Sequence, residues 1–113
     1  MRYCFDLDGT LCTLEVDGMT EGLKKDHLQY DNAKPIPENI QHVNELFDDG
    51  HYIIIETARG TVSKKDWFPE TERQLKEWGV KYHELRTGVK IAADIYIDDK
   101  ARNAHDYFKT GDY

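Results

Sequence analysis

Two aspartates stand two positions apart in the stretch "YCFDLDGTLC" at residues 3–12, where a short apolar run ends. Residues i and i+2 of an extended chain share a face, so Asp6 and Asp8 can point into one pocket. Carboxylates about 5 Å apart repel by roughly 3 kcal/mol at an effective dielectric constant of about 20. A positive group is therefore expected beside them, and oxygen ligands without a His or Cys cluster favour a hard divalent cation such as Mg²⁺.

Two further groups of polar residues follow apolar runs later in the chain. They are Thr57, Ala58 and Arg59 after the run at 52–55, and Asp98 and Asp99 after the run at 94–97. Such short runs, rich in β-branched and aromatic residues, are typical of strands buried on both faces of a parallel sheet. Ligands bind outside the carboxyl ends of strands in these sheets. We therefore expect the reactive groups to meet at one edge of the sheet.

Helical patterns separate the apolar runs. Residues 37–50 and 66–79 carry a proline near the start, apolar residues on one helical face and a glycine at the end. A last helix is expected at about 100–108, and a minor strand at 81–85. Strands that alternate with helices predict right-handed βαβ units in a three-layer α/β sandwich.

The length of 113 residues favours one domain that spans residues 1–113. Residues 11–36 lack a helical period and contain several glycines and prolines, which predicts a functional flap or a mobile segment. No linker or internal repeat divides the sequence.

Composition narrows the classes of function. The formal net charge of −7 disfavours wide contact with a phosphate backbone, so no nucleic-acid partner is expected. The absence of a long apolar run or a signal-peptide pattern predicts a soluble, cytoplasmic protein without membrane contact. The two cysteines have no metal-binding spacing, and we expect Cys4 in the core and Cys12 in a loop.

Four segments resemble, in order, the motifs of the haloacid dehalogenase (HAD) superfamily of phosphatases. They are "DLDGTL" at 6–11, "IIIETARG" at 53–60, a lysine before the third apolar run, and "IYIDDK" at 95–100. The chain looks most like the small capless members that accompany capsule or lipopolysaccharide sugar synthesis. The resemblance implies a Rossmann-like domain with a short parallel sheet, a hairpin flap over about 11–36 and no cap domain.

The resemblance also implies the roles of the acids. Asp6 would attack phosphorus and become an aspartyl phosphate, and Asp8 would act as general acid and base, which divides hydrolysis into two easier displacements. Mg²⁺ would be held by Asp6, by the backbone carbonyl of Asp8 and by Asp98, with Asp99 orienting metal-bound water. Which of Asp98 and Asp99 binds the metal directly stays open.

The remaining site residues would bind the phosphoryl group. Thr57 and the Ala58 backbone amide would hold its oxygens, since such donors stabilise charge without competing as nucleophiles. Gly9 would let the backbone approach the phosphate closely. Lys90 would balance the carboxylates and bind phosphate.

Several of these assignments have alternatives. The other candidates for the lysine are Lys64, Lys65 and Lys81. Arg59 and Arg86 could instead read the rest of the substrate. Glu56 departs from the family pattern, in which the residue before the threonine is usually apolar or small. An acid at this position either faces a cation, orients Arg59 or weakens phosphate binding.

The sequence thus predicts a Mg²⁺-dependent phosphomonoester hydrolase for a sugar phosphate or a related small metabolite of polysaccharide biosynthesis. The resemblance implies that members without a cap have an open site, which suits a bulky phosphoester or a homo-oligomer in which a neighbouring subunit serves as the lid. The alternatives are an inactive HAD scaffold acting as a binding module and a phosphatase for nucleotides or polynucleotide ends. A phospho-receiver domain would need an acceptor aspartate after a mid-chain strand, where this chain has Glu56 and Thr57.

Overall fold

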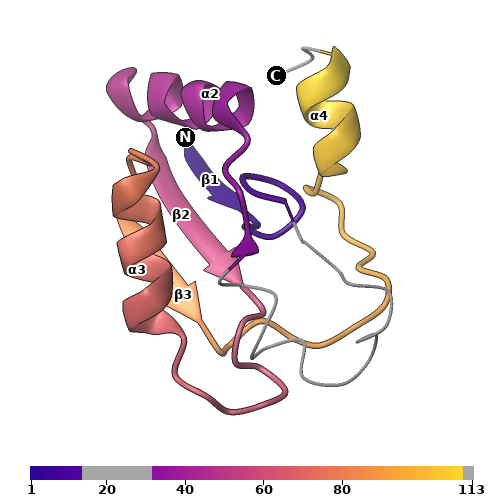
Figure 1. Cartoon of the computed structure of the whole chain (residues 1–113). Coiled ribbons are helices and arrows are strands. Elements are labelled where there is room, and N and C mark those ends of the chain that lie inside the picture. The colour runs from indigo at the N-terminus through magenta and orange to yellow at the C-terminus, as the bar shows by residue number, and fades with distance from the viewer. Residues whose placement is uncertain (14–31, 111–113) are drawn as a thin grey trace.

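The computed structural model describes residues 1–13 and 32–110, and in these ranges strands alternate with helices (Figure 1). The elements are β1 (Arg2–Phe5), α2 (Pro37–Asp48), β2 (Tyr52–Thr57), α3 (Phe68–Glu77), β3 (Glu84–Thr87) and α4 (Ala104–Thr110). The helices predicted at 37–50 and 66–79 are confirmed, and the last helix begins a few residues later than expected. Most of the predicted flap lies at 14–31, outside the described residues.

The three strands form an open parallel sheet in the order β1-β2-β3. Phe5 of β1 is in register with Ile55 of β2, which is in register with Leu85 of β3. Parallel strands end at the same edge, so the residues that follow β1, β2 and β3 meet there. The arrangement is a small α/β fold compatible with a Rossmann-like topology.

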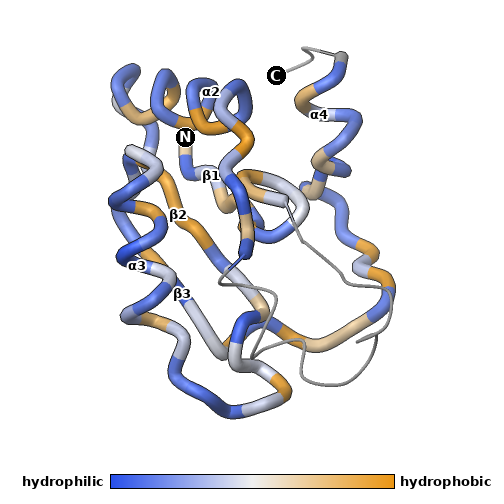
Figure 2. The backbone as a smooth tube through the Cα atoms, viewed as in Figure 1, coloured by the Kyte–Doolittle hydropathy of each residue, from blue (hydrophilic) through white to orange (hydrophobic). Residues whose placement is uncertain are grey.

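The core lies on one face of this sheet. Ile53 and Ile55 alternate with less buried neighbours along β2 and are fully buried, and Figure 2 shows β2 as the most continuous hydrophobic strand. Val43 of α2 and Leu75 of α3 belong to the same buried cluster. Both helices cover one face because right-handed crossovers that add strands in one direction place their helices on the same side.

The third helix, α4, packs on that face as well. The rings of Tyr107 and Phe108 lie 6.2 Å from the ring of Phe5. The described residues therefore form two layers, and the third layer of the expected sandwich is absent among them. Cys4, expected in the core, is exposed, because it precedes Phe5 and points to the opposite face of β1.

The strand predicted at 94–97 is wrong. Within the described residues the third strand is β3, close to the minor strand expected at 81–85, and residues 88–103 contain no strand. Ile95 and Ile97 are 77% and 97% exposed. A short apolar run becomes a strand only where it pairs with a neighbour, and the place beside β2 is taken by β3, which follows α3 after a short connection.

No helix among the residues that the structure describes is long and apolar enough to cross a membrane.

Candidate functional site

The loop that follows β1 is closed by hydrogen bonds to one carbonyl. The Leu7 carbonyl accepts hydrogen bonds from the backbone N–H groups of Thr10, Leu11 and Cys12 at 3.0, 2.8 and 3.3 Å. Gly9 lies in this loop at φ +84°, a conformation that favours glycine. Because Leu7, Leu11 and Cys12 are fully buried, the loop is fastened to the core.

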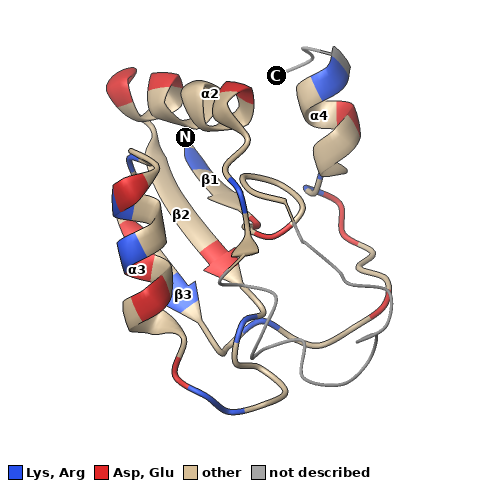
Figure 3. Ribbon diagram, in the orientation of Figure 1, with Lys and Arg blue, Asp and Glu red and all other residues tan. Residues whose placement is uncertain are grey.

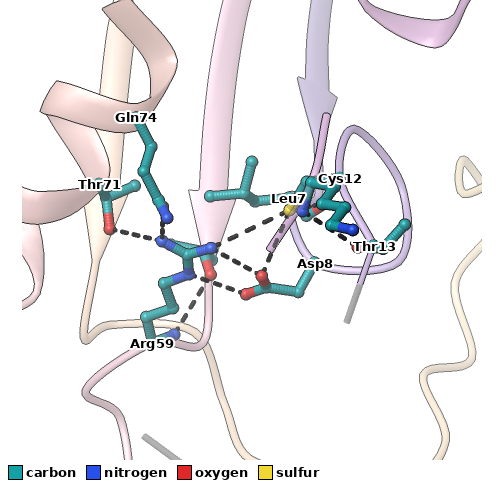
Figure 4. A network of polar contacts seen from close by, with 9 residues as sticks. Leu7, Asp8, Cys12, Thr13, Arg59, Thr71 and Gln74 are labelled. Atoms are coloured by element: carbon teal, nitrogen blue, oxygen red, sulfur yellow. Dashed lines mark hydrogen bonds and ion pairs between the residues drawn. The ribbon is translucent and has the colours of Figure 1, made fainter. Parts of the chain in front are cut away.

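Asp8 is held by a buried arginine (Figure 4). Arg59 Nε donates to Asp8 Oδ2 at 2.9 Å, and Nη2 donates to Oδ1 at 2.8 Å. The side chain of Arg59 is 0% exposed and that of Asp8 is 13% exposed. A bidentate pair of this kind fixes the plane of the carboxylate as well as its position.

The other side of the same guanidinium contacts helix α3. Arg59 Nη1 donates to Thr71 Oγ1 at 3.1 Å and to Gln74 Oε1 at 2.5 Å. Thr71 and Gln74 are buried, and they share the core-facing side of α3 with Leu75. The sequence analysis did not predict either residue. Their polar side chains at positions on the apolar face of an amphipathic helix could have indicated them.

A buried thiol completes the contacts of Asp8. Cys12 Sγ lies 3.4 Å from Asp8 Oδ1 and 4.0 Å from Arg59 Nη2. Burial raises the pKa of the Cys12 thiol well above its usual range, and the negative charge of Asp8 raises it further. The thiol therefore stays protonated and packs as a neutral group beside the ion pair.

Asp6 is more open and contacts a lysine. Its Oδ1 lies 3.2 Å from Lys90 Nζ, and the two side chains are 41% and 21% exposed. Burial raises the pKa of Asp6, while the positive charge of Lys90 opposes the rise. The Lys90 ammonium also lies 5.3 Å from the centre of the Tyr96 ring.

The other candidate lysines have different neighbours. Lys81 pairs with Asp48 at 2.8 Å, and Lys65 lies over the ring of Trp67 at 4.1 Å from its centre. Lys64 stands in the turn before α3 with a positive φ of 65°. Of the four candidates, the structure places Lys90 against Asp6.

The residues after β2 lie at the same edge of the sheet. Thr57 is buried, and its Oγ1 accepts a hydrogen bond from the Arg59 backbone N–H at 3.2 Å. Ala58 is exposed, and its carbonyl accepts a hydrogen bond from the Thr61 N–H at 2.9 Å. In this arrangement the Thr57 hydroxyl shapes the turn that brings Arg59 to Asp8.

Glu56 and Arg86 contact each other across β2 and β3. Arg86 Nε lies 3.3 Å from Glu56 Oε2, and Arg86 Nη1 lies 3.3 Å from Glu84 Oε1. Of the three roles considered for Glu56, the structure shows the one in which it faces a cation.

Asp98 and Asp99 are not brought to the other acids. Both are exposed, and Asp98 Oδ1 accepts a hydrogen bond from the Lys100 backbone N–H at 2.6 Å. Among residues 1–13 and 32–110, no three His, Cys, Asp or Glu side chains are grouped to hold a metal ion. The ligand set that the resemblance implies is therefore not assembled in this arrangement.

Comparison with known proteins gives structural likenesses only. A structural-genomics target from Vibrio cholerae is similar at a TM-score of 0.73 and 24% identity, over 95% of this chain and 86% of that one. Two structures of the Pnkp1/Rnl/Hen1 complex, one described as an RNA repair complex, have TM-scores of 0.52 and 0.51 at 21% and 18% identity.

The coverage of these likenesses is unequal. The matches to the two complexes cover 87% and 96% of this chain, but only 30% and 29% of those chains. No family model matches the chain, and no curated protein matches it significantly. At these identities the similarities show the fold, and the case for a function rests on the site.

Proposed function

We propose that this protein is a phosphomonoester hydrolase of the HAD type that works through an aspartyl phosphate on Asp6. The observation that carries the proposal is the difference between the two acids after β1. Asp6 is partly open and paired with Lys90, whereas both carboxylate oxygens of Asp8 accept hydrogen bonds from Arg59. A nucleophile must be reachable and a general acid or base must be held in place, which is the division seen here.

The proposed reaction has two displacements. The cycle starts from the form in which Asp8 has taken up a proton. In the first displacement, an Asp6 oxygen bonds to phosphorus, the bond to the leaving oxygen breaks, and that oxygen takes the proton from Asp8, which becomes the carboxylate that Arg59 holds through two hydrogen bonds. In the second, water attacks phosphorus, gives a proton to Asp8 and releases phosphate from Asp6. Both acids end as they began, and the ammonium of Lys90 offsets the charge of the arriving phosphate.

The phosphoryl oxygens would be held at the ends of β1 and β2. Gly9, Thr57 and the backbone amide of Ala58 are the proposed contacts, supported by their place at the edge where β1 and β2 end. Hydrogen-bond donors aimed at developing charge supply a large share of catalysis in such transfers.

We propose Mg²⁺ as the cofactor of this reaction. Its expected ligands are Asp6, the Asp8 carbonyl, and Asp98 or Asp99. The described arrangement does not bring Asp98 and Asp99 to the others, so no step above depends on the metal.

We propose two candidate substrate classes. The first is a sugar phosphate or related small metabolite of polysaccharide biosynthesis, as the resemblance to capless HAD members implies. The second is a polynucleotide end, favoured by the structural likeness to chains of an RNA repair complex. The net charge of −7 and an α2 helix with acidic residues but no Lys or Arg (Figure 3) would weaken wide contact with a nucleic acid.

The proposal extends to assembly, because the resemblance to capless HAD members implies an open site that a neighbouring subunit can cover. A homo-oligomer whose neighbouring subunit covers the open site is our proposal for this chain. Sedimentation of the purified protein would reveal it.

The experiment measures Mg²⁺-dependent phosphate release from sugar phosphates, nucleotides and oligonucleotides phosphorylated at either end. We expect Asp6→Asn to lower kcat by at least about 10³-fold, because the nucleophile is lost. Asp106→Asn, which changes an exposed acid on α4, is the matched control and should leave kcat unchanged. Activity that survives Asp6→Asn would contradict the mechanism, and activity that survives removal of the metal by a chelator would contradict Mg²⁺ as the cofactor. The preferred substrate would decide between the two classes.

A further inference from the structure

Arg59 is the most heavily coordinated charged side chain of the site. Its three side-chain nitrogens donate to Asp8, Thr71 and Gln74, which belong to the loop after β1 and to helix α3. Burial of a guanidinium is costly unless its donors are satisfied and its charge is paired, and both conditions hold here. The contacts therefore form one connected network between the loop and α3 (Figure 4).

Helix α3 is the fixed end of this network, and Asp8 is the end that it holds. Thr71 and Gln74 lie on a regular helix whose Leu75 is fully buried in the core, so their positions are fixed by packing. Asp8 lies in a loop and has no contact with α3 except through Arg59 among the interactions described above. Arg59 itself is 0% exposed, so its side chain is shielded from direct contact with a substrate.

We propose that Arg59 is a positioning residue for Asp8, and that Thr71 and Gln74 position Arg59, so that helix α3 sets the orientation of the general acid and base. This inference rests on the proposed function. In this role Arg59 holds Asp8 and does not bind the substrate, and two buried residues of α3 contribute to turnover. A displacement of about 1 Å from productive geometry can cost up to roughly 10²-fold in rate.

The test compares two substitutions of Gln74 on α3 whose new side chains have a shape similar to that of glutamine. Gln74→Met removes the oxygen that accepts from Arg59, and Gln74→Glu keeps an oxygen there. With p-nitrophenyl phosphate and Mg²⁺, we expect Gln74→Met to lower kcat roughly 10- to 100-fold with little change in KM, because the general acid and base is misplaced while binding is intact. We expect Gln74→Glu to recover most of that loss. Arg73→Gln, an exposed change on the same helix, should leave kcat as it was.

A second measurement follows Arg59 without substrate or metal. In the full chain, the Nε–H proton of Arg59 should exchange slowly with water, since it is buried and bonded to Asp8. Gln74→Met should remove this protection in the NMR spectrum, and Gln74→Glu and Arg73→Gln should keep it.

The outcomes separate the two proposals. If the unmodified chain hydrolyses none of the phosphoesters, the proposed function fails. If it turns over p-nitrophenyl phosphate but Gln74→Met and Gln74→Glu have the same kcat, or if both retain equal protection of the Arg59 proton, only the positioning role is overturned. A loss of kcat with an unchanged KM in Gln74→Met, recovered in Gln74→Glu, would support it.

Discussion

Two ion pairs stand beside each other after β1, and they are built differently. Asp8 and Arg59 form two short hydrogen bonds in a buried setting, and Arg59 is anchored further on α3. Asp6 and Lys90 share one contact of 3.2 Å with both side chains partly exposed. The first pair fixes geometry and the second stays adjustable, a combination that suits a held general acid and base next to a reachable nucleophile.

The segments that carry Arg59 and Lys90 also differ in how well they are packed. Arg59 follows β2, whose Ile53 and Ile55 are fully buried. Lys90 belongs to residues 88–103, which have no helix or strand and expose Ile91 and Ile97. The rigid pair thus comes from the core of the sheet, and the adjustable pair depends on a segment with little packing of its own.

The largest effect should come from breaking the buried pair. Arg59→Met removes the guanidinium and leaves Asp8 buried without its partner, so the free energy of unfolding should fall by about 3–5 kcal/mol. Urea denaturation followed by circular dichroism would measure it. Arg73→Met is the control, because the exposed pair of Arg73 with Glu77 should be worth less than about 1 kcal/mol. Equal losses in the two variants would show that the Arg59 network is not the rigid element described here.

Much of this contrast could not be predicted from the sequence. The positions of Asp6, Asp8 and Arg59 at strand ends followed from apolar runs and from the rule that parallel strands end together. Lys90 was expected beside the carboxylates, where it contacts Asp6. The pairing of Asp8 with Arg59 was not predicted, because it depends on side-chain direction over distances that a pattern leaves open. Thr71 and Gln74 were missed because a polar residue on an amphipathic helix usually faces solvent.

The third strand was the main error of the sequence prediction, for a physical reason. The runs at 52–55 and 94–97 look alike in composition, but only the first pairs with neighbours on both sides. Residues 84–87 include Glu84 and Arg86 and gave a weaker pattern, yet they occupy the place beside β2. Local composition reports hydrophobicity, whereas strand formation also requires an available edge.

A smaller effect should follow from breaking the partly exposed pair of Asp6 and Lys90. Because the positive charge of Lys90 opposes the rise in the pKa of Asp6, Lys90→Met should raise that pKa further. Asp6 must be ionised to attack, so the acid limb of the kcat/KM profile should move to higher pH, while Lys90→Arg should keep the limb in place. Stability should change by less than about 1 kcal/mol, since the pair is partly exposed.

Profiles of kcat/KM against pH for the unmodified chain and the two variants would check this. A limb that moves to lower pH in Lys90→Met would contradict the assigned contact. A loss of stability as large as that in Arg59→Met would remove the distinction between the two pairs.

The smallest effect should come from the segment that carries Lys90. Ile97 is 97% exposed, so Ile97→Ala should change the free energy of unfolding by no more than about 0.5 kcal/mol. Ile53 is 0% exposed, and the same substitution there should cost about 2–5 kcal/mol, because it removes buried methyl groups and leaves a cavity. Urea denaturation of both variants measures the difference directly. If Ile97→Ala cost as much as Ile53→Ala, residues around Ile97 would be packed in the folded protein, and the contact of Lys90 with Asp6 would belong to a fixed part of the site.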